Sequence, residues 1–147
     1  MFYIVAAIVF AADLATKKIV SSILEPAQSI PIIKGLLNIT YIQNTGVAFG
    51  LFPNQRIALV IIGVVVCAVI LYYFSKAKKR DILLQIAFAI IFGGSLGNLF
   101  DRVFYGYVID YIDVTFFSVF NFADIAINAG VLLILCDIFF KGERCFR

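Results

Sequence analysis

Histidine and tryptophan are absent from this sequence, and charged side chains make up only 14% of its 147 residues. Without an imidazole there is no Ser-His-Asp or Cys-His triad, no histidine general base and no histidine-ligated metal site. Any chemistry that the chain performs must use Asp, Glu, Lys, Ser, Thr, Tyr or Cys. We expect no bound metal and no cofactor.

Cysteine is also scarce. Cys67, Cys136 and Cys145 are widely spaced and form no C-x-x-C pair, so a disulfide framework is not supported. Cys67 and Cys136 lie inside long apolar runs, and we interpret both as buried apolar side chains. Cys145 belongs to a basic tail, but the ending Cys-Phe-Arg is not a prenylation signal.

The shortage of charge excludes a water-soluble monomer. Apolar residues make up 63% of the chain, against ~45–50% in a soluble domain, and the mean hydropathy is +1.05. Such a chain cannot cover one core with a polar surface, so its solvent must be largely lipid. The net charge of +3 is too small to suggest nucleic-acid binding. The length indicates a single domain, residues 1–147.

Long apolar runs predict four transmembrane helices. At ~1.5 Å per residue, two uncharged runs can each cross most of a ~30 Å hydrocarbon core. A third stretch carries Asp124 as its only charge, and the N-terminal run continues its helical apolar spacing past Asp13, Lys17 and Lys18. A cleaved signal peptide is the rival interpretation there, but no basic residue precedes the run. The predicted spans are residues 2–24, 57–74, 82–100 and 121–140.

Basic residues divide unevenly between the two sides of these spans. Most lie between the second and third spans or after the fourth: Lys76, Lys78, Lys79, Arg80, Lys141, Arg144 and Arg147, against Lys34, Arg56 and Arg102 elsewhere. The positive-inside rule then places both termini in the cytoplasm. Lys17 and Lys18, near the outer end of the first span, run against the rule. They could snorkel, or Asp13 could hold Lys17 as an i, i+4 pair.

Two segments are left on the outer side. Residues 25–56 contain three prolines and the β-leaning stretch 37–42, which indicates short strands with a turn. Residues 101–120 are rich in Tyr, Phe, Val and Ile and predict an irregular or strand-like arm at the interface. The expected fold class is an all-α polytopic membrane protein with a small extracytoplasmic β-rich segment and a short outer arm.

Polar and charged side chains that are energetically unfavourable beside hydrocarbon lie near the outer ends of the predicted spans. A carboxylate beside hydrocarbon costs ~2.5 kcal/mol or more, so it is retained only if it is paired or functional. The members of this group are Asp13, Asn44, Asn98, Asp101, Arg102, Asp110, Asn121 and Asp124. The spacing of Asn98, Asp101 and Arg102 places them on one helix face, where a structural polar clasp is the simplest interpretation.

Asp110 and Asp124 have no Lys or Arg within four residues. Two carboxylates brought together at an apolar interface would share a proton. That is the arrangement with which aspartic proteases hydrolyse peptides without histidine, nucleophile or metal. A structural pair or an ion site is also compatible with the spacing. We assign Asp113 to the solvated side, and a Ser-Lys dyad of Ser21 with Lys17 is weaker because Asp13 is available to Lys17.

The motifs occur as five ordered blocks: Asp13 with Lys17, then residues 44–50 (NTGVAFG), 93–102 (GGSLGNLFDR), 106–111 (GYVIDY) and 120–124 (FNFAD). In order and spacing, over essentially the whole chain, they resemble the bacterial lipoprotein signal peptidase family, signal peptidase II. The resemblance implies an aspartic endopeptidase with four transmembrane helices. Such an enzyme removes the signal peptide from a prolipoprotein by cutting just before a cysteine that carries a diacylglyceryl group.

The resemblance also implies residue roles. Asp110 and Asp124 would form the catalytic dyad; Asn98, Asp101, Arg102 and Asn121 would hold the dyad and the substrate backbone. Asn44 would contact the substrate, and Asp13 and Lys17 would have a structural or orienting role. Residues 25–56 would form a β-cradle on the membrane, and 101–120 a short arm over the site.

Two departures from the family pattern are minor, because neither changes a charge: Val47 where Ala is common, and Ile125 where Ser is common. The resemblance implies inhibition by globomycin-like cyclic peptides and a location in the bacterial cytoplasmic membrane, with the site at the outer leaflet. We expect a monomer whose partners are the prolipoprotein and membrane lipids, and no nucleic acid.

Two other classes remain open on the residues alone. A small transporter or ion channel could line a cation pathway with Asp13, Asp101, Asp110 and Asp124. It predicts acidic groups spread along the membrane normal, whereas here they lie at one end of the spans. A non-catalytic scaffold protein would have no use for the outer asparagines.

Overall fold

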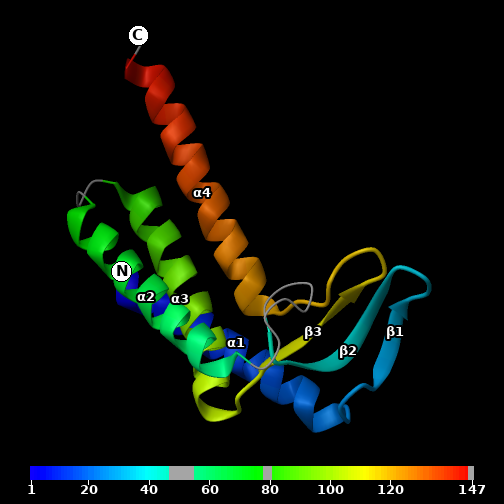
Figure 1. Ribbon diagram of the computed structural model, residues 1–147. Coiled ribbons are helices and arrows are strands. Elements are labelled where there is room, and N and C mark those ends of the chain that lie inside the picture. The colour runs from blue at the N-terminus through cyan, green and yellow to red at the C-terminus, as the bar shows by residue number, and fades with distance from the viewer. Residues whose placement is uncertain (47–54, 78–80, 146–147) are drawn as a thin grey trace.

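The computed structural model describes residues 1–46, 55–77 and 81–145. Four helices and three strands follow one another along the chain (Figure 1). The order is α1 (Phe2–Ile23), β1 (Ser29–Ile33), β2 (Leu37–Asn44), α2 (Arg56–Lys76), α3 (Ile82–Phe104), β3 (Val108–Val114) and α4 (Phe122–Cys145). The protein is therefore mostly helical, with a small sheet at one end of the helices.

Three helices in the described part of the chain are long and apolar enough to cross a membrane: α2, α3 and residues Phe122–Phe139 of α4. The helix α1 has 22 residues but carries Asp13, Lys17 and Lys18. Most large apolar side chains of α2 and α4 face outward, as expected of helices surrounded by lipid, whereas most of those of α3 are buried or half-buried. These features support a membrane-embedded protein.

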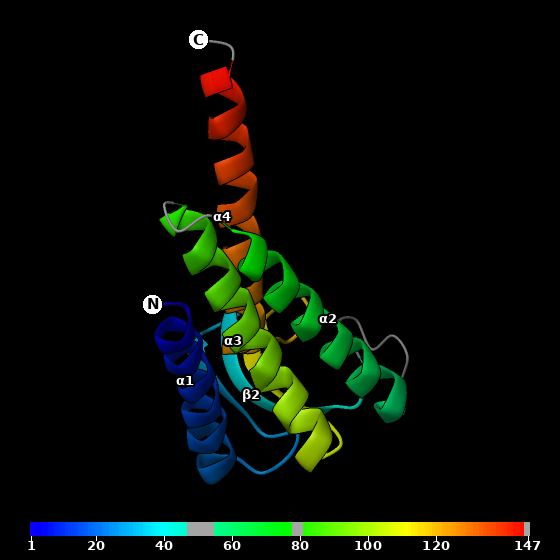
Figure 2. The ribbon, with the colours of Figure 1, turned by 90° about the vertical axis from the view of Figure 1, so that its left-hand side faces the viewer.

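The helix α3 is central and packs against the other three helices (Figure 2). Small residues allow this close approach. A Cβ added to Gly93 would lie 2.6 Å from the Ala6 carbonyl oxygen of α1, and one added to Gly94 would lie 2.7 Å from the Ala123 carbonyl oxygen of α4. The glycine block of α3 thus brings α1 and α4 together around the outer half of α3.

The three strands form one antiparallel sheet in the order β1-β2-β3. The β-leaning stretch 37–42 became β2, as predicted, and the arm supplies β3 as the third strand. In this register Ile42 lies opposite Asp110 and Asn44 lies opposite Val108. The turn from α3 into β3 contains Gly106, whose φ of +85° is in the left-handed region that favours glycine.

An apolar cluster fixes the sheet to the end of α1. Val20 and Leu24 from α1 and its C-cap pack with Tyr41 of β2 and with Ile109 and Tyr111 of β3. Because strand side chains alternate between faces, Asp110 faces away from its neighbours Ile109 and Tyr111. The cluster therefore helps determine where Asp110 lies.

Several sequence-based expectations need correction or lie outside the described residues. Cys67 is buried as predicted, but Cys136 is exposed. The prediction for Cys136 was wrong because an apolar run alone does not distinguish a lipid-facing side chain from an interior one. The helix α3 continues past the predicted end of the span at residue 100, so Asp101 and Arg102 lie in its last turn and not in the outer arm, as their helical spacing from Asn98 indicated. Val47 and the basic residues at 78–80 and 147 lie outside the described residues.

Candidate active site

The first turn of α4 carries Asp124, and Asn121 immediately precedes this helix. The Asn121 side-chain Oδ1 accepts a hydrogen bond from the Asp124 backbone N–H at 3.0 Å, and Asp124 Oδ2 accepts one from the Asn121 backbone N–H at 3.2 Å. This reciprocal pair is a capping box, which satisfies two otherwise unpaired N–H groups. It fixes the Asp124 carboxylate at the helix N-terminus, where negative charge is favoured.

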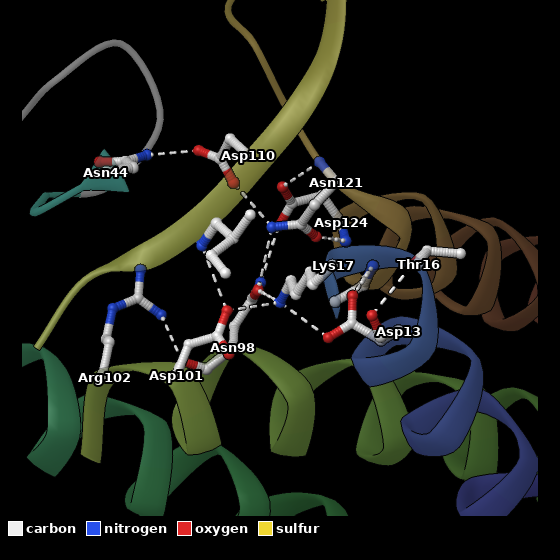
Figure 3. A network of polar contacts seen from close by, with 12 residues as sticks. Asp13, Thr16, Lys17, Asn44, Asn98, Asp101, Arg102, Asp110, Asn121 and Asp124 are labelled. Atoms are coloured by element: carbon white, nitrogen blue, oxygen red, sulfur yellow. Dashed lines mark hydrogen bonds and ion pairs between the residues drawn. The ribbon is translucent and has the colours of Figure 1, made fainter. Parts of the chain in front are cut away.

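Asp110 approaches from β3 (Figure 3). Its Oδ1 accepts a hydrogen bond from Asn121 Nδ2 and its Oδ2 accepts one from Asn44 Nδ2, both at 2.7 Å. Asn44 is fixed in turn, because its Oδ1 accepts the Gly46 backbone N–H at 2.9 Å. Asn121 therefore contacts both carboxylates, and Asp110 is held from two sides.

Burial raises the pKa of Asp110 from 3.8 to about 6. The hydrogen bond from Asn44 opposes this rise in pKa, whereas the neighbouring negative charge of Asp124 adds to it. A raised carboxyl pKa means that the proton is held more tightly. The pair can thus hold one proton at a pH where an isolated aspartate would be ionised.

Asn98 of α3 connects the carboxylates to the interior. Its Nδ2 donates to Asp124 Oδ1 at 2.8 Å, and its Oδ1 accepts from Lys17 Nζ and from Asn121 Nδ2, both at 3.1 Å. Because Lys17 can only donate, the Asn98 oxygen must face it, and the Asn98 amino group must face Asp124. The cation of Lys17 thereby determines the orientation of the amide.

Lys17 is also the centre of a buried ion network. Its Nζ lies 2.7 Å from Asp13 Oδ2 and 2.9 Å from Asp101 Oδ2, and the three side chains are 2%, 0% and 1% exposed. The i, i+4 pair with Asp13 was expected, but the contacts with α3 were not. A buried cation shared by two carboxylates is compatible with an apolar interior only because every charge is paired.

Each of the two carboxylates bound to Lys17 also holds the backbone beside one member of the Asp110–Asp124 pair. Asp13 Oδ1 accepts the N–H of Ala123 at 3.0 Å, and Asp101 Oδ2 accepts the N–H of Ile109 at 3.2 Å. Ala123 precedes Asp124, and Ile109 precedes Asp110. The network therefore ties α1 and α3 to the two segments that carry the pair.

Both aspartates line one cavity of about 710 Å³. Its other polar lining residues are Asn44, Asn98, Arg102, Ser118 and Asn128. A mostly apolar wall continues along α4 and the segment before it: Phe117, Val119, Phe120, Ile125, Ala129 and Leu132. Arg102 donates from Nη2 to the Gly46 carbonyl at 3.1 Å. Its buried Nε has no hydrogen-bond partner among the described residues.

The structure brings most of the predicted residues together and separates two others. Asp113 lies away from the cavity, in the sheet, where it accepts hydrogen bonds from Asn38 and Thr40. Ser21 donates to the carbonyl oxygen of Lys18 and not to Lys17, so the Ser-Lys dyad is not formed. Our sequence reasoning missed the apolar wall of α4, although Ile125, Ala129 and Leu132 have the i, i+4, i+7 spacing of one helix face.

Comparisons with known proteins agree over nearly the whole chain. The sequence model of the family described as Signal peptidase (SPase) II matches residues 5–140. A lipoprotein signal peptidase of Fusobacterium nucleatum is 43% identical over 136 residues, covering 90% of this chain and 82% of that protein. One from Halothermothrix orenii is 40% identical and covers 92% of each chain.

Solved structures give the same result. One bacterial membrane enzyme structure matches with a TM-score of 0.90 and 31% identity, covering 97% of this chain and 90% of the other. A second bacterial membrane enzyme structure matches with a TM-score of 0.84 and 33% identity, covering 93% and 91%.

Proposed function

The chain belongs to the signal peptidase II family, and from this premise we propose that it is a lipoprotein signal peptidase of the aspartic class. Its reaction is hydrolysis of a diacylglyceryl-modified prolipoprotein immediately before the lipidated cysteine. The observation that carries the aspartic assignment is that Asp110 and Asp124, from different elements, line one cavity and share Asn121 as a hydrogen-bond partner. Neither histidine nor an external cofactor is needed.

The two catalytic aspartates have different roles. Asp110, with its raised pKa, carries the shared proton, and Asp124, in its capping box, is the general base. Asp124 takes a proton from water as the oxygen attacks the scissile carbonyl, while Asp110 donates its proton to the carbonyl oxygen. When the intermediate collapses, the C–N bond breaks, the proton from water reaches the leaving amine, and Asp110 regains its own.

The cavity supports the substrate assignment. Its apolar wall along α4 matches the apolar segment of a signal peptide, and its polar end matches the peptide bond to be cut. Arg102 has a buried Nε available as a donor, and Asn44 lies beside Asp110, so we assign both to the substrate backbone. A globomycin-like cyclic peptide would fill the same cavity. We expect the enzyme to act as a monomer, because both aspartates come from one chain.

We assign α1 as a fourth membrane span. Its 22 residues correspond to roughly 33 Å at ~1.5 Å per residue. Asp13 and Lys17 are paired inside the protein, so α1 presents only Lys18 as an exposed charge. With both termini in the bacterial cytoplasm, the sheet and the dyad lie at the outer leaflet. That is where the lipid anchor of the substrate would hold the scissile bond.

Lys17 is assigned as a positioning residue. It fixes the Asn98 amide that donates to Asp124. Through Asp13 and Asp101 it also fixes the backbone that precedes each catalytic aspartate. It does not line the dyad cavity, so its effect is on the geometry of the dyad and not on substrate contact.

The test compares three matched Asp-to-Asn variants purified in detergent with a synthetic diacylglyceryl prolipopeptide. Asp110→Asn and Asp124→Asn should lose cleavage, whereas Asp113→Asn, on the same strand as Asp110 but outside the cavity, should cleave at the native rate. Full activity in either dyad variant would refute the aspartic mechanism. If the native chain failed to cut the lipidated peptide, the assignment of substrate would be wrong.

A further inference from the structure

Lys18 is not explained by the active site. Its neighbour Lys17 is buried in the ion network, but Lys18 is exposed and forms no ion pair with any described residue. It is on the side of the membrane where the distribution of basic residues would not place a lysine. Because none of the described residues pairs with it, this exposed cation is available to an anionic partner.

Lys18 lines a second cavity, of about 360 Å³, between the ends of α1 and α3 and next to the sheet. None of its lining residues lines the dyad cavity. Its polar part includes Lys18 and the hydroxyl-bearing side chains of Tyr41 and Tyr107, and its apolar part includes Leu14 and Phe100. Buried Tyr41 and half-buried Tyr107 are held in the sheet region, which gives the cavity a defined polar rim.

Of the charged side chains that line this cavity, Lys18 is the one without an ion pair among the described residues. Lys17 and Asp101 also line it, 2.9 Å apart, but Lys17 is shared with Asp13 as well, so this buried network offers no free positive charge to a ligand. The Asp101 oxygen that contacts Lys17, Oδ2, also accepts the Ile109 N–H at 3.2 Å. Among the described lining residues, Lys18 is therefore the cation without an ion pair, and Tyr41, Tyr105 and Tyr107 bring hydroxyl-bearing side chains; both kinds of group can donate to a phosphate oxygen.

The apolar lining favours a phospholipid over free inorganic phosphate as the ligand. Leu14 lies one turn before Lys18 on α1. The centroid of the Phe100 ring lies 5.9 Å from that of Phe10 and 6.2 Å from that of Tyr105. An inorganic phosphate would gain nothing from these side chains. A phospholipid would place its phosphodiester at Lys18 and its first acyl carbons against Leu14 and Phe100. Tyrosines are also enriched at this depth of a membrane.

We propose that this cavity is a binding site for one anionic phospholipid of the leaflet that contains the active site. Lys18 pairs with the phosphodiester, and the hydrogen-bonded hydroxyl pair of Tyr41 and Tyr107 donates its remaining O–H to a phosphate oxygen. The lipid bridges the ends of α1 and α3, whose buried Lys17–Asp101 pair forms the back of the cavity. The site concerns a resident lipid and is independent of the peptidase assignment.

The test is native mass spectrometry of the full chain released from detergent, with phosphatidylglycerol and phosphatidylcholine of identical acyl chains and no substrate. The native chain should retain a single phosphatidylglycerol in preference to phosphatidylcholine. Lys18→Gln should weaken this retention roughly fivefold, the effect of one lysine near an anionic surface. Lys34→Gln, an exposed lysine in the β1–β2 turn, should not change it.

Two further arms make the proposal refutable. Ser21→Trp fills the cavity and keeps Lys18, so it should abolish lipid retention; continued retention would show that Lys18 attracts lipid without the cavity. Complete displacement of the lipid by millimolar inorganic phosphate would overturn the lipid assignment in favour of a free anion. If the native chain retained phosphatidylglycerol and phosphatidylcholine equally, and Lys18→Gln did the same, there would be no site for an anionic lipid. Unchanged circular dichroism of each variant excludes misfolding as the cause.

Discussion

Replacing Lys17 with methionine tests the central network of the structure. The substitution keeps an unbranched side chain of similar length but removes the cation between Asp13 and Asp101, whose side chains are 0% and 1% exposed. Breaking a buried ion pair from one side typically costs about 3–5 kcal/mol, because the remaining charge has no partner. We expect Lys17→Met to lose that much free energy of unfolding.

The assay is SDS-induced unfolding in mixed micelles, followed by circular dichroism. Lys34→Met, which removes an exposed lysine, serves as the control and should stay close to the native chain. In the triple variant Asp13→Asn, Lys17→Met, Asp101→Asn, each asparagine oxygen can still accept the Ala123 or Ile109 N–H. Because no buried charge is then unpaired, most of the lost stability should return.

The same triple variant separates the contribution of Lys17 to stability from its role in positioning the dyad. Without the lysine, only Asn121 Nδ2 still holds the Asn98 oxygen away from Asp124, and the hydrogen bond from Asn98 to that charged group is worth about 1.5–3 kcal/mol. The kcat should therefore fall below native by up to roughly a hundredfold, with little change in KM. Native kcat in the stable triple variant would refute the positioning role. Loss of less than about 1 kcal/mol in Lys17→Met would refute the energetic argument.

Three other predictions concern the pKa of Asp110 and the space around two helix glycines. In the native chain the hydrogen bond from Asn44 lowers the pKa of Asp110, so Asn44→Ala should raise that pKa and move the alkaline limb of the kcat/KM profile to higher pH. An unmoved limb would assign that limb to another group. A carboxyl whose pKa is raised from 3.8 to about 6 destabilises the fold once it is ionised. The stability of Asp110→Asn relative to the native chain should therefore rise by about 2.4 kcal/mol between pH 4 and pH 7 in unfolding assays. Gly97→Ala should cost about 1–3 kcal/mol in the same assay, because its Cβ would lie 2.9 Å from Asp13 Cγ, whereas Gly63→Ala meets only a movable leucine methyl and should cost less.

The membrane character and the family could be predicted from sequence because both rest on local patterns. Apolar runs long enough to span a bilayer predicted α2, α3 and α4, and the β-leaning stretch 37–42 predicted β2. The resemblance to the signal peptidase II family is confirmed by the family match over residues 5–140. The capping box of Asn121 and Asp124 was not predicted, although two polar residues three positions apart at the start of a helix are a local signal for one.

The sequence alone also determined which groups needed partners. Asp13, Lys17, Asp101, Asp110 and Asp124 are costly next to hydrocarbon wherever the chain places them, so composition and spacing were enough to single them out. The pairing of Lys17 with Asp13 followed from one helix turn. Even the absence of histidine limited the chemistry before any contact was known.

Only the tertiary structure decided how those groups are paired. Lys17 meets Asp101 and Asn98 because the glycines of α3 let α1 approach, and Asp110 meets Asn121 because β3 joins a sheet that packs on the end of α1. The same packing left Cys136 facing outward and separated Lys18 from the network. Helix turns fix contacts over three or four residues, whereas contacts between elements depend on packing distances and sheet register, which no local pattern specifies.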